Sequence, residues 1–180
     1  SMRSSVFTDA IVFICAHNED GCMGFIINKP HEISLSSLMR RVDGMERQPG
    51  DVIDELISEH QTVRLGGPID ENRGFILHST EYEVEATIPV TPEIALTSTL
   101  SILRDISNGI GPRQAMISLG YASWEKNQVE QEIADNAWLV LDTCPEDLVF
   151  NDSLVSKYDD ALSMIGISSK ALFVPHAGHA

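Results

Sequence analysis

Two glycines and a proline interrupt a stretch of residues that otherwise favours a β-strand. The segment VRLGGPI spans residues 63–69 and places Gly66, Gly67 and Pro68 near its centre. Proline has no N–H to donate to a β-ladder, and glycine weakens a strand because it has no side chain to pack. We therefore expect a bulge or a sharp bend at these three residues, and a continuous flat sheet is not expected.

Several other stretches predict strands. Residues 6–17 and 21–28 flank the turn HNEDG, and their apolar runs are continuous, so we expect both faces of these two strands to be covered. GFILHS follows VRLGGPI after the polar residues DENR, which predicts a hairpin with a four-residue loop. Further strands are predicted at residues 85–90, 113–124, 137–142 and 171–175.

Two helices are predicted in the first two thirds of the chain. Ser34 can cap a short helix over residues 35–42, where apolar side chains recur at helical spacing. Thr97 or Ser98 is expected to begin a second helix, which Gly109 ends.

Two more helices are predicted in the last third. Asn127 and Glu130 form a variant of the capping box, in which each side chain bonds a backbone N–H of the other residue. Residues 154–166 carry one apolar face and end in glycine. Strands and helices alternate without a regular βαβ order, which favours a mixed α+β fold. We expect one domain over residues 1–180, with a polar surface excursion at 43–62 and a tail at 176–180.

Charge and cysteine content exclude several classes of protein. The 180-residue chain has a net charge of −15, which repels phosphate backbones, so no direct binding of nucleic acid is expected. The longest uninterrupted apolar run, residues 10–16, is too short to cross a membrane. Cys15 and Cys22 are interpreted as small buried residues rather than as a redox pair. The sparse cysteines and the missing signal peptide indicate the reducing cytoplasm.

The chain also lacks the sequence motifs of the common catalytic and cofactor sites. No GxGxxG, GxxxxGK[ST], HExxH or GxSxG is present, so no cofactor is expected. Glu130 and Glu132 lie about 200° apart around a helix, so they cannot act as a carboxylate pair. Tyr121, Trp124 and Trp138 are interpreted as core or rim aromatics whose polar atoms are satisfied.

Five polar residues remain as candidates for a ligand site. His17 ends the first predicted strand and His78 lies near the end of GFILHS, so both could serve as metal ligands or as a base. Asn18, Arg73 and Glu132 complete this candidate site. The alternative is structural: each histidine bonds a loop carbonyl, Arg73 pairs with nearby acids, and Glu132 bonds a neighbouring loop. No third metal ligand of clear spacing is present, so neither a metal nor a catalytic residue is predicted.

An ordered series of motifs resembles the AlgH/YqgE family of bacterial proteins. The series, which spans residues 7–167, is HNEDGCMGFIINKP, LGGPI, RGFILHS, GIGP, LGYASWEKNQVEQEI, NAWLV and DLVF. This resemblance implies a bent, bifurcated mixed β-sheet that forms a pseudo-barrel and is flanked by helices. The family usually opens with a further strand, so the resemblance also implies a missing strand before residue 1.

The resemblance implies no enzyme activity, cofactor or catalytic set, and members are often described as transcriptional regulators. Two hypotheses follow. The first is a non-enzymatic binding or regulatory protein that acts through a protein or small-molecule partner. The second is a ligand- or metal-binding enzyme with a site around His17 and His78. A cysteine nucleophile is a weaker variant of the second, because it needs an exposed thiol with a lowered pKa.

Overall fold

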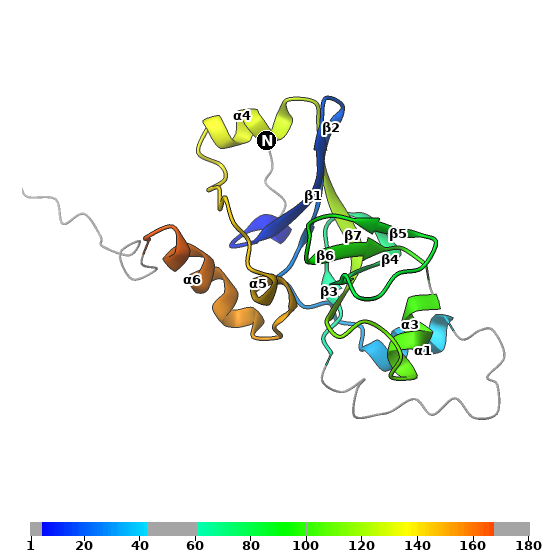
Figure 1. Cartoon of the computed structure of the whole chain (residues 1–180). Coiled ribbons are helices and arrows are strands. Elements are labelled where there is room, and N and C mark those ends of the chain that lie inside the picture. The colour runs from blue at the N-terminus through cyan, green and yellow to red at the C-terminus, as the bar shows by residue number, and fades with distance from the viewer. Residues whose placement is uncertain (1–4, 43–60, 100, 168–180) are drawn as a thin grey trace, which may run out of the picture.

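The central strand of the fold is β7 (Ala115–Glu125), which pairs with three other strands. The computed structural model describes residues 5–42, 61–99 and 101–167 (Figure 1). Its strands follow the order β1-β2-β7-β4-β6-β5, with β3 pairing with β7 off this path. The other strands are β1 (Val12–Asn18), β2 (Gly21–Ile26), β3 (Arg64–Leu65), β4 (Ile69–Ser79), β5 (Thr87–Pro89) and β6 (Ile94–Thr97).

The Gly-Gly-Pro segment carries the chain across β7. Strand β3 pairs in parallel with Ser118 and Leu119, and β4 pairs antiparallel with the same two residues. Because a strand has only two edges, β3 and β4 lie on opposite edges of β7. The expected bend at residues 66–68 is therefore confirmed. The expected hairpin is wrong, because DENR lies inside β4, where the register with β7 shifts between Ile69 and Gly74.

The crossing brings two backbones into direct contact, which only glycine permits. A Cβ on Gly67 would lie 2.2 Å from the carbonyl carbon and oxygen of Tyr121. On the other side, Gly120 has φ of 72°, and a Cβ there would lie 2.5 Å from the carbonyl oxygen of Gly67. The crossing thus needs glycine on both strands.

The sheet divides in two beside this crossing. Strand β2 pairs with the C-terminal half of β7, but the residues after β2 leave β7 and pair with β3 instead. The Leu65 N–H donates to Lys29 O at 2.9 Å, and the His31 N–H donates to Val63 O at 2.8 Å. Strand β3 therefore fills the space between the diverging strands, and the bent, bifurcated mixed sheet that the sequence predicts is confirmed.

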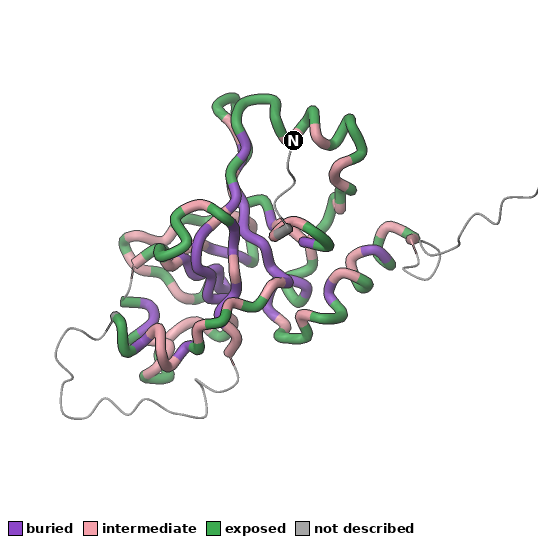
Figure 2. Tube along the Cα trace, turned by 180° about the vertical axis from the view of Figure 1, so that it is seen from behind, coloured by how far each residue is buried: buried purple, intermediate pink, exposed green. Residues whose placement is uncertain are grey.

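The β1–β2 ribbon projects beyond the core with the end of β7 (Figure 1). Figure 2 shows mostly exposed chain at this tip. Within β1 only Phe13 is buried, whereas Ile14 is 40% exposed and residues 16–18 are exposed. The expectation that both faces of this strand are covered is wrong, because the end of β1 projects with the ribbon beyond the core.

Five helices flank the sheet within the described residues, and two predictions for this part of the fold are wrong. Helix α3 begins at Ser101 rather than at residue 97 or 98, because Thr97 ends β6. Residues 137–142, which were predicted as a strand, form neither a strand nor a helix. Helix α5 covers residues for which no helix is predicted from the sequence. The helices are α1 (Leu35–Val42), α3 (Ser101–Ser107), α4 (Gln128–Ala134), α5 (Glu146–Phe150) and α6 (Leu154–Met164), and a 3₁₀ turn, η1, spans Ser5–Phe7.

Both faces of the central strands are buried in separate apolar clusters. In β4, Phe75 and Leu77 pack with α5 and α6, whereas Ile76 packs with α1 and α3. This division follows from the alternation of side chains along a strand. Helix α4 lies at the tip, where its Val129 packs against Trp124 and Trp138. No helix in the described part of the chain is long and apolar enough to cross a bilayer.

Two predictions fall on residues outside the described ranges. Residues 43–60 contain nearly all of the expected surface excursion. Residues 168–180 contain the predicted strand 171–175 and the tail 176–180.

Candidate functional site

His17 and His78 lie toward opposite ends of the sheet. His17 is opposite Cys22 in the β1–β2 ladder, and Cys22 is opposite Trp124 of β7. His78 is opposite Ala115, which precedes Trp124 by nine residues along β7. At about 3.3 Å per residue, roughly 30 Å of strand separates the two levels. The structure therefore does not bring the two histidines into one site.

His78 is a core histidine whose ring nitrogens are both engaged. Its side chain is fully buried, and its Nδ1 lies 3.0 Å from Ser79 O. A carbonyl oxygen can only accept, so Nδ1 carries the proton and Nε2 accepts from Thr97 Oγ1 at 2.8 Å. Tyr82 packs edge-on against the ring. His78 therefore has a structural role, because its ring is bonded to a carbonyl and to a hydroxyl. Among the described residues, no three His, Cys, Asp or Glu side chains gather as metal ligands would.

His17 pairs with Glu130 at the exposed tip. Its Nε2 lies 2.5 Å from Glu130 Oε1, and both side chains are about half exposed. The predicted capping box is wrong, because Asn127 has φ of 62° and its side chain makes no capping hydrogen bond. Gln128 holds the start of α4 instead, by accepting a hydrogen bond from the Glu125 N–H at 2.9 Å. The Glu130 carboxylate therefore joins α4 to β1. The Glu130 pKa is lowered by a hydrogen bond from its own N–H and by His17.

The other candidate residues serve local structure or lie apart. Asn18 Oδ1 accepts a hydrogen bond from the Asp20 N–H at 2.9 Å and so closes the β1–β2 turn. The Arg73 guanidinium lies 5.0 Å above the ring of Phe75, an arrangement that allows a cation–π interaction. The expected ion pair between Arg73 and nearby acids is not formed within the described ranges. Ligand binding by these residues stays a prediction.

Glu132 joins both tryptophans of the chain. Its Oε2 accepts hydrogen bonds from Trp124 Nε1 at 3.0 Å and from Trp138 Nε1 at 2.7 Å. Gln128 Nε2 donates to its other oxygen at 3.2 Å. The two indole rings and Phe7 pack edge-on or tilted against one another. The structural interpretation of these tryptophans, with their polar atoms satisfied, is confirmed.

We predict that Glu132→Ala lowers the free energy of unfolding by about 2 kcal/mol, because two partly buried indole N–H groups lose their charged acceptor. Tryptophan emission should shift to the red, since both tryptophans of the chain lie at this site. Glu132→Gln retains one acceptor oxygen and should show a smaller loss in urea unfolding. Unchanged emission in the alanine variant would contradict this role.

The thiols of Cys15 and Cys22 do not have the lowered pKa of a reactive cysteine. Burial raises the pKa of Cys15 to about 12, and it also raises the pKa of Cys22. A reactive cysteine needs a lowered pKa, so the weaker variant of the enzyme hypothesis lacks its main requirement. All three cysteines are free thiols.

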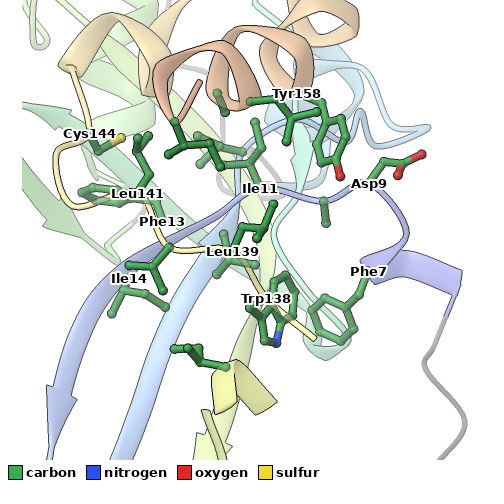
Figure 3. A pocket seen from close by; sticks show the side chains of 18 of the residues that line it. Phe7, Asp9, Ile11, Phe13, Ile14, Trp138, Leu139, Leu141, Cys144 and Tyr158 are labelled. Carbon is green, nitrogen blue, oxygen red and sulfur yellow. The ribbon is translucent and has the colours of Figure 1, made fainter. Parts of the chain in front are cut away.

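A cavity of about 750 Å³ runs beside β1 (Figure 3). We call this cavity the edge groove. Its walls are η1 and β1, the segment 136–142, and the facing side of α6. Most of its lining side chains are apolar or aromatic, including Phe7, Ile11, Phe13, Ile14, Trp124, Trp138, Leu139, Val140, Leu141 and Leu162. Its size and lining are those of a ligand site.

Strand β1 and residues 138–141 border the edge groove, and both have backbone groups without partners among the described residues. Strand β1 pairs only with β2 in the sheet order, so its outer edge carries no strand in the described part of the chain. Across the same described ranges, residues 138–141 form no backbone hydrogen bond. Leu139 is 61% exposed and Val140 is 53% exposed. The groove thus presents backbone donors and acceptors together with uncovered apolar side chains.

Two buried cations support the base of the groove. Arg64 is 1% exposed and donates to Ile27 O at 2.9 Å, to Asn151 O at 2.9 Å and to other carbonyls of α5. Lys157 is fully enclosed and donates to Leu148 O and Val149 O. Burial and the nearby guanidinium lower the pKa of Lys157 to about 8. Sequence analysis did not identify either residue.

The curled, divided sheet with flanking helices and an edge groove defines an α+β protein of the half-barrel type. The chain belongs to the AlgH-like family, whose sequence model matches residues 1–170. A UPF0301 protein of Rhizobium etli is 39% identical over 99% of this chain and 88% of its own length. A UPF0301 protein of Agrobacterium fabrum is 41% identical over 97% of this chain and 85% of its own length.

Two solved structures resemble this fold. The solution structure of the AlgH protein from Pseudomonas aeruginosa has a TM-score of 0.77 and 31% identity, and the match covers 99% of this chain and 90% of that one. A crystal structure of a protein from Corynebacterium diphtheriae has a TM-score of 0.63 at 18% identity, covering 90% and 80% of the two chains. The second likeness concerns the fold alone.

Proposed function

We propose that the protein is a non-enzymatic binding protein whose edge groove takes an extended segment of a partner polypeptide as an added strand. The observation that carries this proposal is that β1 and residues 138–141 line one cavity and have backbone groups without hydrogen-bond partners among the described residues. An added strand would supply main-chain hydrogen bonds to an exposed sheet edge, which is a recurring way of binding a peptide.

The lining favours a polypeptide over the other partners. A small apolar molecule would fill the volume but would leave the backbone groups of both segments unpaired. Nucleic acid is disfavoured, because the lining contains no Lys, Arg or His and the net charge is −15. The three free thiols agree with a reducing compartment, and we place the protein in the cytoplasm. Any regulatory role would then act indirectly, through the bound partner.

The test uses a synthetic peptide with a core of five alternating valine and threonine residues, flanked by serines. We expect saturable binding that changes tryptophan emission, because Trp124 and Trp138 both line the groove. Bound peptide should also slow hydrogen exchange at the amides of residues 12–14 and 138–141. The combined readout separates added-strand pairing from filling of the cavity by an apolar molecule.

A pair of surface variants provides the control. Leu139→Asp places a charge on the groove wall, and it should abolish binding without unfolding the protein, because this side chain is 61% exposed. Val155→Asp, on α6 outside the groove, is 97% exposed and should bind normally. Protection of both segments without any peptide would show that the protein's own chain fills the groove, and would refute the proposal. Binding without backbone protection would also refute it.

A further inference from the structure

Two buried cations share one backbone carbonyl at the end of α5. Val149 O accepts a hydrogen bond from Arg64 Nη1 at 2.5 Å and from Lys157 Nζ at 3.4 Å. Arg64 is 1% exposed, and Lys157 has no contact with solvent. The guanidinium has a carboxylate partner in Asp152 at 3.2 Å, whereas Lys157 forms no ion pair within the described ranges. The Lys157 ammonium is therefore buried beside a like charge without a carboxylate of its own.

The groups that face Lys157 act on its charge in opposite directions. Burial and the Arg64 guanidinium disfavour the ammonium, and together they lower the pKa of Lys157 to about 8. Asp147, Asp152 and Cys144 favour the ammonium, but both aspartates are exposed, so solvent screens their charges. With this pKa, Lys157 is roughly nine-tenths charged at pH 7 and roughly one-tenth charged at pH 9.

We infer that Lys157 is a latch between α5 and α6 that a single proton loosens. Lys157 lies on α6, and its two acceptors, Leu148 O and Val149 O, lie on α5 (Figure 1). The charged ammonium holds the two helices together weakly, because burial and Arg64 oppose it, and the neutral amine holds them firmly. The latch works without a partner in the edge groove, so it is independent of the proposed function.

The stability that the latch confers rises with pH, and the cysteines have the opposite effect. A lysine in the unfolded chain keeps its proton up to about pH 10.4, so between about pH 8 and pH 10 the unfolded chain binds a proton that the native state lacks. Burial raises the pKa of Cys15 to about 12 and also raises the pKa of Cys22 and of Cys144, so the thiols lower stability above about pH 8.5. Variants that differ only at Lys157 share these thiols, and comparing them isolates the latch.

The direct test is an NMR titration of the protein with 13C in its four lysines. We expect one Cε signal, which is absent from every Lys157 variant, to titrate near pH 8 and the other three to titrate above about pH 10. In urea, the unfolding equilibrium constant should fall about tenfold between pH 7 and pH 9 relative to that of Lys157→Met. A Lys157 signal that titrates with the other lysines overturns the latch, and this titration needs no variant that folds poorly.

Two variants hold the latch in its two states. Lys157→Arg stays charged at every pH, so hydrogen exchange in α6, corrected for its intrinsic pH dependence, should remain fast at pH 9. Lys157→Met carries no charge, and exchange in α6 should already be slow at pH 7. Lys126→Met, at an exposed position, is the matched control and should keep the pH dependence of the unmodified protein. A pH dependence that persists in Lys157→Arg refutes the latch, because another group is then its source.

Discussion

Gly67→Ala should lower the free energy of unfolding by about 4 kcal/mol or more, which is among the largest effects that single substitutions have. The added Cβ would lie 2.2 Å from the carbonyl carbon and oxygen of Tyr121 and 2.5 Å from the N of Ala122. These are backbone atoms of the central strand, so no side-chain rotation relieves the clash. The crossing must open, and the pairing of both β3 and β4 with β7 weakens with it.

Urea unfolding and the melting temperature measure this effect. A loss of this size should lower the melting temperature by roughly 10 °C in a domain of this length. Gly74→Ala is the matched control, because its Cβ would meet only a Leu119 methyl group at 4.0 Å. Gly109→Ala tests the cost of a positive φ alone. Gly109 has φ of 71°, and an added Cβ would have no heavy atom within 4 Å. Equal stability of the Gly67 and Gly74 variants would contradict the close crossing.

The bend at the Gly-Gly-Pro segment could be predicted from sequence, because glycine and proline disrupt a strand wherever it lies. The crossing could not, because it depends on β7, which follows about 50 residues later along the chain. DENR has the composition of a turn, yet Ile69 before it and Gly74 after it both pair with β7, so these four residues form an irregularity within β4. Local composition predicted a hairpin, and long-range pairing determined the strand that formed.

The other structural errors also come from tertiary contacts. Asn127 and Glu130 have the spacing of a capping box, but the nearby His17 engages the glutamate at the tip. Residues 137–142 have the composition of a strand, but within the described part of the chain no neighbouring strand pairs with them. The predicted strand is therefore wrong, because a strand also requires a partner.

The candidate site was less predictable than the fold. Glu132 was predicted to bond a neighbouring loop or a ligand, and its carboxylate bonds both tryptophans. Ligand binding by Glu132 stays a prediction. The edge groove had no local sequence signal, because its walls come from segments that are far apart along the chain.

Arg64 and Lys157 had no sequence signal either. Arg64 lies between apolar residues of a predicted strand, and Lys157 lies in a predicted amphipathic helix. Charged side chains in such positions usually reach solvent. Their burial follows from α5, a short helix whose last carbonyls have no partners within the helix and accept hydrogen bonds from both cations.

Arg64→Met should lower the free energy of unfolding by about 3–5 kcal/mol, because it removes one partner from a buried charged network. Methionine has a similar apolar stem but no donors, so carbonyls of Val149, Phe150 and Asn151 lose their contact with the guanidinium. The same side chain also bonds Ile27 O, so its loss uncouples α5 from the sheet. Urea unfolding and hydrogen exchange in α5 and α6 measure both effects.

Arg64→Lys should recover only part of this loss, because one ammonium cannot reach all the carbonyls that the planar guanidinium contacts. Arg104→Met, on the exposed face of α3, is the matched control and should change stability by less than about 0.5 kcal/mol. If Arg64→Met unfolds like the control, the carbonyls of α5 must be satisfied without the guanidinium. Faster exchange confined to α5 and α6 would show that Arg64 holds this wall of the edge groove against the sheet.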